Sequence, residues 1–316
     1  MSRSRALAAV LIALAVSLAC GGCGFGLRLK TGAVRLRVTR DFGAHQVGSL
    51  SLSKVPGSET DLALLTRLFP KVGTEHVPLG STSSGITSVA GHRAVVPERW
   101  TLFVNGVHAS KSAAAMKLRK GDQVWFDLHD QSAAGVIPAV VGAFPEPFTS
   151  GINGQRYPTT LECSKGFKAQ CASITRQLRG HGVVASPGAP GYGSGPDTFS
   201  INVGTWHQLY GEVAAQLIKY GPGASGVYAR FTHGGREIAL EDAAGSVVKT
   251  LGPGSGLIAA TANSNDPAPT WIVTGTDAAG VRAAVRALNP QTLAGHFALA
   301  VHGAQRYPVP LPGSGS

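Results

Sequence analysis

The chain has 316 residues, of which 43% are hydrophobic and 14% charged, and its formal net charge is +11. This hydrophobic content excludes a disordered chain, and the length exceeds that of one ordinary small domain, so we expect two folded domains. The basic residues are spread along the sequence, which argues against a nucleic-acid partner. A diffuse attraction to anionic lipid headgroups or wall polymers is the expectation that remains.

The first 22 residues have the features of a secretory signal. Arg3 and Arg5 precede an apolar run from Ala6 to Ala19, and small residues follow this run. That order is typical of an export signal, and a run of about 14 residues is shorter than the roughly 20 that a permanent membrane-spanning helix needs. We expect residues 1–22 to be removed, which reduces the net charge to +9 because two arginines are lost.

Two cysteines at the end of this signal resemble the acylated cysteine of a bacterial lipobox. Cys23 follows two glycines and begins a tether over residues 23–32. Cys20 follows Ala19, but Ser17 stands where an aliphatic residue is usual, and in the box of Cys23 that position holds Cys20. Cys23 is the preferred lipidation site and Cys20 the alternative. Acylation, including palmitate, would anchor the protein to the extracytoplasmic face of the cell membrane.

The other two cysteines, Cys163 and Cys171, are eight residues apart. An even remainder of cysteines in an exported protein predicts a disulfide. The alternative, a metal-binding pair, is disfavoured because no histidine or second cysteine pair lies nearby in the sequence.

Residues 33–130 have the pattern of a small α+β domain in which one helix packs on a mixed sheet. Apolar and polar residues alternate in its first segments, as in half-buried strands. Four leucines between Ser58, a candidate N-cap, and Pro70 form one face of a helix. The expected strands are Ala33–Arg40, Ser49–Val55, Ile86–Val89, Trp100–Gly106 and Gln123–Leu128.

The rest of the chain predicts an α/β domain with a mixed sheet over residues 158–312, because strand and helix patterns alternate there. Residues 131–157, rich in proline and glycine, are expected to be a linker or an edge segment. The expected helices are Cys171–Gly180, His207–Gly221 and Asp277–Asn289, and residues 308–316 are expected to be a frayed end. The expected strands are Thr159–Cys163, Ser200–Trp206, Gly226–Phe231, Ile238–Asp242, Gly256–Ala262, Thr270–Gly275 and His296–Gly303.

Short motifs in the first half occur in a characteristic order: Trp100, then Phe103-Val104-Asn105-Gly106, then Gly121-Asp122, then Trp125. Together with the helical Leu64-Leu65 pair they resemble the transcobalamin C-terminal-like domain, also described as domain of unknown function 4430, over roughly residues 33–130. The resemblance implies a β-grasp-like fold. It also implies a corrinoid, such as cobalamin, or another small ligand, because the related domain of animal cobalamin carriers covers the bound vitamin.

Trp100, Asn105 and Trp125 are the residues that would meet such a ligand, but the same residues also have a structural interpretation. Asn-Gly is a leading hairpin-turn dipeptide, and a Gly-Asp pair suits the turn before a strand. Tryptophans are more often buried in a core than exposed to a ligand. Turn and core roles are the favoured interpretation.

No catalytic motif emerges from the sequence. Gly221–Gly226 matches G-x-G-x-x-G, but it follows a helix pattern and precedes a strand, so we expect a turn. No nucleophile elbow, metalloprotease motif, P-loop or calcium loop occurs. An enzyme would require clustering of carboxylates from the second half, namely Glu162, Asp197, Glu212, Glu237, Glu241, Asp242, Asp266 and Asp277.

These observations predict a non-catalytic lipoprotein that binds a small molecule, with a membrane transporter as a possible partner and with no resident cofactor or metal. The alternative is a structural lipoprotein that binds an anionic wall polymer or a membrane protein. The sequence does not predict the oligomeric state.

Overall fold

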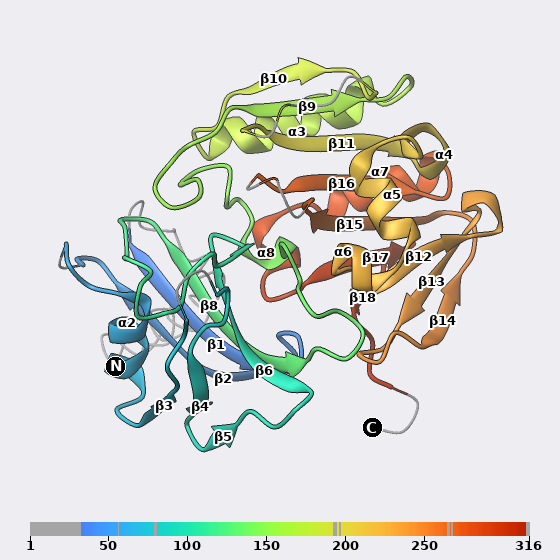
Figure 1. The fold of residues 1–316 in the computed structure, drawn as a ribbon. Coiled ribbons are helices and arrows are strands. Elements are labelled where there is room, and N and C mark those ends of the chain that lie inside the picture. Colours follow the sequence, from blue (N-terminus) through green and yellow to red (C-terminus); the bar gives the residue numbers. More distant parts are fainter. Residues whose placement is uncertain are drawn as a thin grey trace, which may run out of the picture. The chain divides into compact units, whose positions relative to one another are not determined.

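The first half of the chain folds around a five-stranded mixed sheet (Figure 1). The structure is a computed structural model, and it describes residues 33–55, 57–78, 81–191, 195, 197–263, 266 and 268–313. The strand order is β2 (His45–Leu52), β1 (Val34–Arg40), β8 (Gln123–Asp130), β6 (Glu98–Val104) and β7 (Val107–His108). β1 and β8 are parallel, and the other pairs are antiparallel. Helix α2 (Asp61–Leu68) and a small sheet of β3 (Val72–Thr74), β4 (Ile86–Val89) and β5 (His92–Arg93) complete this half.

Both faces of the five-stranded sheet carry buried side chains. On one face, the valine and leucine side chains of β1 pack with Leu64 and Leu65 of α2. The opposite face presents Phe103 and Trp125, which belong to a second core shared with the second half of the chain. Because successive residues of a strand point to opposite faces, the same alternation serves two cores.

Several boundaries in this half differ from the predictions, and two of the differences have a visible local cause. β2 begins at His45 rather than Ser49, directly after a turn in which Asp41 and Phe42 adopt positive φ. Helix α2 is capped by Thr60 rather than Ser58, and the Thr60 side chain accepts a hydrogen bond of 3.2 Å from the amide of Ala63. The first helical residue is Asp61, so Thr60 rather than Ser58 occupies the N-cap position.

The second half folds around a seven-stranded sheet in the order β10-β9-β11-β16-β15-β17-β18. The first four strands are parallel, and the last three run antiparallel to their neighbours. Their bounds are β9 (Thr159–Cys163), β10 (Ala185–Gly188), β11 (Phe199–Thr205), β15 (Ser255–Thr261), β16 (Thr270–Gly275), β17 (Ala298–His302) and β18 (Gln305–Val309). A separate small sheet contains β12 (Ala229–Thr232), β13 (Glu237–Glu241) and β14 (Val247–Leu251). The predicted α+β and α/β class is therefore confirmed.

Helices cover both faces of the seven-stranded sheet (Figure 1). α3 (Lys168–Gly180) and α7 (Ala278–Ala287) contribute to one core, and α5 (Val213–Lys219) to the other. Short helices α4 (Trp206–Leu209), α6 (Pro222–Ser225) and α8 (Pro290–Leu293) and the single turns η1 (Val141–Ala143) and η2 (His233–Gly235) lie between longer elements.

The continuous helix predicted over His207–Gly221 is wrong. The chain forms α4 and α5 instead, because Glu212, which follows Gly211, takes an extended conformation and begins a new helix. The sequence patterns also missed β10, β14 and β18. β10 and β18 each contain a proline and lie at the two edges of the sheet, where a missing N–H is tolerated.

The proline-rich segment after β8 packs against both halves. The amide of Val140 donates to the carbonyl of Gly106 at 2.8 Å, and the amide of Val141 donates to the carbonyl of Phe297 at 3.0 Å. The described residues, from Ala33 to Gly313, belong to one compact unit. The signal segment and the lipidation candidates Cys20 and Cys23 lie outside the described residues.

Candidate functional site

The Asn-Gly pair of the first half forms a two-residue hairpin turn between β6 and β7. Asn105 and Gly106 both have positive φ, 54° and 75°, and Val104 pairs with Val107 across the turn. This is the geometry for which Asn-Gly is favoured. The turn role predicted for these residues is therefore present in the structure.

The Asn105 side chain ties this turn to the Gly121-Asp122 turn. Its Nδ2 donates to Asp122 Oδ1 at 3.0 Å and to the carbonyl of Gly151 at 2.9 Å, while its Oδ1 accepts from the amide of Gln123 at 2.9 Å. Asn105 is 1% exposed. The Asn-Gly and Gly-Asp turns are thus one hydrogen-bonded unit, in which the polar groups of each turn bind those of the other.

Trp100 and Trp125 are both buried, on opposite faces of the sheet. Trp100 Nε1 donates to the carbonyl of His92 at 3.2 Å. Trp125 Nε1 donates to Thr39 Oγ1 at 2.6 Å, and that hydroxyl donates to Asp127 at 2.5 Å. Neither tryptophan lines either of the two cavities described below. Ligand contact by Trp100, Asn105 and Trp125 stays a prediction, and in this structure all three stabilise the fold.

A cavity of about 330 Å³ lies in the second half, on the face of the seven-stranded sheet that α5 covers. Its lining includes three carboxylates, from Glu162, Glu212 and Asp266, and contains no lysine, arginine or histidine among the described residues. The remaining lining residues are Gly195, Ser200, Asn202, Val213, Ala214, Leu217, Thr261, Ala262, Asn263, Ala268 and Thr270. We call this space the acidic cavity.

Glu162 and Asn202 form the floor of the acidic cavity from neighbouring parallel strands. They are directly paired in the register of β9 and β11, so both side chains point to the same face. Asn202 Nδ2 donates to Glu162 Oε2 at 2.5 Å. Asn202 is 2% exposed, and its Oδ1 has no hydrogen-bond partner within the described part of the chain. Reversing the amide would place two acceptors together, so the free Oδ1 requires a donor from elsewhere.

Two further carboxylates of this cavity have perturbed pKa values. Burial raises the pKa of Glu212 above its usual value, the charge of Glu162 raises it further, and the donating amide of Gly191 opposes both effects. Burial also raises the pKa of Asp266, Asp197 adds to that effect, and the amide of Ala268 at 2.9 Å opposes it. Burial, with neighbouring negative charge in addition, thus makes the ionised forms of Glu212 and Asp266 costly, and a bound cation would offset that cost.

The structure brings together only part of the carboxylate set that an enzyme would need. Glu241 pairs with Arg230 and Glu237 with His233, while Asp242 accepts amides within a turn and Asp277 caps α7. Asn202 was missed by sequence reasoning, although a polar residue inside the apolar strand pattern SINVGTW is a usable signal.

Among the described residues no helix is long and apolar enough to cross a membrane, and no cluster of three His, Cys, Asp or Glu has a metal-binding arrangement.

Comparison with known families supports the reading of the first half. No curated protein matches this chain. One family model, described as Domain of unknown function (DUF4430), matches residues 74–130, a span that includes Trp100, the Asn-Gly and Gly-Asp turns, and Trp125. The matched segment begins at Thr74, the last residue of β3, and covers β4 through β8 and their connections. Residues 74–130 therefore form a DUF4430 segment in the first half of the chain, as the order of their motifs predicted.

Proposed function

We propose that this protein is a non-catalytic, extracytoplasmic binding module whose acidic cavity captures a small molecule through a protonated amine. The observation that carries this proposal is the unpartnered, buried Oδ1 of Asn202 beside the carboxylates of Glu162 and Glu212. All three groups accept hydrogen bonds, and two of them bear negative charge when ionised. An ammonium group supplies both the missing donors and the missing positive charge.

The size of the cavity limits the ligand. A volume of about 330 Å³ is at the lower end of the range for small-molecule sites, and it favours a ligand much smaller than a corrinoid. Val213, Ala214 and Leu217 of α5 give part of the wall an apolar character. We expect a short aliphatic chain with at least one primary amine.

The signal segment supports the proposed location. A lipid anchor at Cys23, or alternatively Cys20, would hold the cavity at the outer face of the cell membrane, where a transporter could receive the ligand. Mass spectrometry of the mature N-terminus should find a diacylglyceryl-cysteine, and an unmodified N-terminus further along the chain would contradict the anchor.

Isothermal titration of the protein with putrescine, an aliphatic diamine, tests the ligand class. We expect saturable binding, and no binding of butanediol, which has the same shape but no charge. Glu162→Gln and Glu212→Gln should each weaken putrescine binding at least tenfold, because each removes one negative charge from the cavity. Lowering the pH should also weaken binding, since the raised pKa of Glu212 brings protonation into a less acidic range.

Glu237→Gln is the matched control, because Glu237 pairs with an exposed histidine outside the cavity. Its putrescine affinity should equal that of the unaltered protein. Equal binding of diamine and diol, or equal losses in all three variants, would refute an amine site in the acidic cavity.

A further inference from the structure

The carboxylates at the acidic cavity form two pairs. Burial raises the pKa of Glu212, and the nearby charge of Glu162 raises it further. Burial likewise raises the pKa of Asp266, and there the additional charge is that of Asp197, which is exposed and stands outside the cavity lining. We call Glu162 and Glu212, which are both buried, the inner pair, and Asp197 and Asp266 the outer pair.

The strand register separates the two pairs along the sheet. Glu162 of the inner pair lies opposite Asn202 on β11, and Ser200, two residues earlier on the same strand, lies opposite Thr270 at the start of β16. The outer pair belongs to the loops that enter β11 and β16, which are neighbouring parallel strands. Two strand residues span about 7 Å, so the outer pair lies at least that far along the sheet from the level of Asn202.

Between the two pairs the cavity has a polar floor and an apolar wall. Ser200 and Thr270 are directly paired and line the cavity from the same face of the sheet. Helix α5 begins after the inner pair and packs against β15 and β16, and its Val213, Ala214 and Leu217 also line the cavity. An unbranched methylene chain suits this wall, and its two ends would then lie at the two pairs.

The inner end also contains a polar group that indicates a ligand independently of the carboxylates. Asn202 is 2% exposed, and its Oδ1 lacks a hydrogen-bond partner in the part of the chain that the structure describes. An unsatisfied buried acceptor is costly, and an ammonium group would donate to it while remaining beside Glu162.

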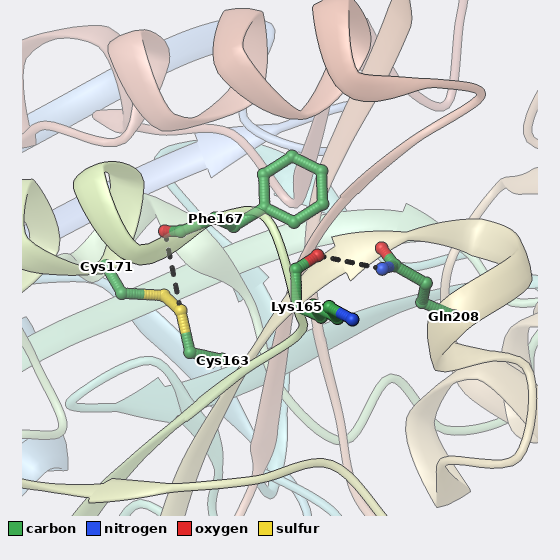
Figure 2. The surroundings of a disulfide bond; sticks show 5 residues. All are labelled: Cys163, Lys165, Phe167, Cys171 and Gln208. Atoms are coloured by element: carbon green, nitrogen blue, oxygen red, sulfur yellow. Dashed lines mark hydrogen bonds between the residues drawn. A yellow bond between two sulfur atoms is a disulfide. The ribbon is translucent and has the colours of Figure 1, made fainter.

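The strand that carries Glu162 is held at its carboxyl end (Figure 2). The disulfide predicted from the sequence joins Cys163, the next residue of β9, to Cys171 in the first turn of α3, with a Cα–Cα distance of 6.3 Å. Both cysteines line a second cavity, of about 560 Å³, on the opposite face of the sheet. Gln208 Nε2 of α4 donates to the carbonyl of Lys165 at 3.0 Å. These links fix the strand end before a ligand arrives, which lowers the cost of ordering the inner pair around it.

We propose that the acidic cavity selects linear dications, with one ammonium group at the inner pair and Asn202 Oδ1 and a second ammonium group at the outer pair. This inference rests on the proposed function, which by itself requires only one amine. A monoamine leaves the outer pair without a counter-charge, whereas a diamine compensates both pairs. The substrate class is the unbranched aliphatic diamines and polyamines.

Titration calorimetry with putrescine and with butylamine, at constant ionic strength, compares two ligands that have the same chain length but different charge. We expect both to bind, and putrescine to bind at least tenfold more tightly. Asp266→Asn should lower the putrescine affinity nearly to that of butylamine and should change the butylamine affinity less than twofold. The asparagine keeps the oxygen that accepts the Ala268 amide, so the loop conformation is retained. Asp197→Asn should act in the same direction, severalfold.

Asp41→Asn is the matched control, because it removes an exposed carboxylate from the first half of the chain, outside the cavity. Both affinities should stay unchanged in this variant. Equal affinities for putrescine and butylamine in the unaltered protein would overturn the second ammonium subsite and leave the proposed amine site intact. Equal losses for the two ligands in Asp266→Asn would also overturn it, since Asp266 would then act on the first ammonium group. Binding of neither amine would refute the proposed function together with this inference.

Discussion

Asp61 stands at the start of α2, where an acidic residue is usually favourable because of the helix dipole. In this fold it is 1% exposed, and neither carboxylate oxygen has a hydrogen-bond partner in the described part of the chain. Burial raises its pKa to about 8, the charge of Asp122 adds to the shift, and Arg119 opposes it. Position in a helix predicts the sign of a dipole interaction, but the buried environment decides the net effect here.

Asp61→Asn should therefore stabilise the protein at neutral and alkaline pH. The folded-state pKa lies above the unfolded value near 3.8, so the stability linked to Asp61 is fully present below about pH 4 and is lost as the pH rises toward 8. The advantage of the variant should grow by up to about 1.4 kcal/mol per pH unit across that window. Urea unfolding at several pH values measures it.

Asp41→Asn is the matched control, because Asp41 is exposed and pairs with an exposed His45. It should change the free energy of unfolding by less than about 0.5 kcal/mol at each pH. A gain for Asp61→Asn that is the same at pH 4 and pH 9 would show that ionisation of Asp61 is not the cause.

At the scale of elements, the Asn-Gly and Gly-Asp motifs act through contacts between their turns. Asn105→Ala removes three side-chain hydrogen bonds and leaves Asp122 with one fewer donor, in a position where φ is 54°. Lost buried hydrogen bonds and the αL penalty for alanine together should lower the free energy of unfolding by about 2–4 kcal/mol. Denaturant unfolding measures this change.

Asn153→Ala separates the two contributions. Asn153 also has a positive φ, 53°, but its side chain is exposed. Its replacement should cost only the backbone penalty, about 1 kcal/mol. If both variants lose the same stability, the Asn105 side-chain bonds contribute nothing and the motif is only a turn signal.

The elements also show why part of the structure could be predicted and part could not. The period-two pattern of Val34–Arg40 and the helical pattern after Asp277 depend on residues close in sequence, and a strand and a helix form at these places as predicted. The acidic cavity depends on Glu162 lying beside Asn202, forty residues away, because β11 is placed next to β9. Local patterns determine elements, whereas sheet order determines which polar side chains meet. The basic side of β1 gives a second example of a contact that local patterns do not predict. The guanidinium of Arg37 lies 5.8 Å from the centroid of the Trp125 ring, and the alternation of residues in β1 predicts only the face on which Arg37 lies.

At the scale of the whole molecule, the second half packs on the face of the five-stranded sheet that is opposite to α2. Phe297, which precedes β17, is 3% exposed and lies within about 5.5 Å, between ring centroids, of Phe42, Phe103 and Trp125. Aromatic rings at this spacing combine a large buried area with favourable edge-to-face geometry. We therefore expect the two halves to unfold together rather than as independent domains.

Phe297→Ala and Phe126→Ala test this cooperativity by removing buried rings from different cores, since Phe126 is fully buried on the α2 side of the sheet. Each should lower the stability by about 3–5 kcal/mol. Scanning calorimetry should show one endotherm that both variants shift to lower temperature, because both halves contribute side chains to the core that contains Phe297. Two endotherms, with Phe126→Ala shifting only one of them, would instead show that residues 33–130 fold independently and that the aromatic contact joins two autonomous domains.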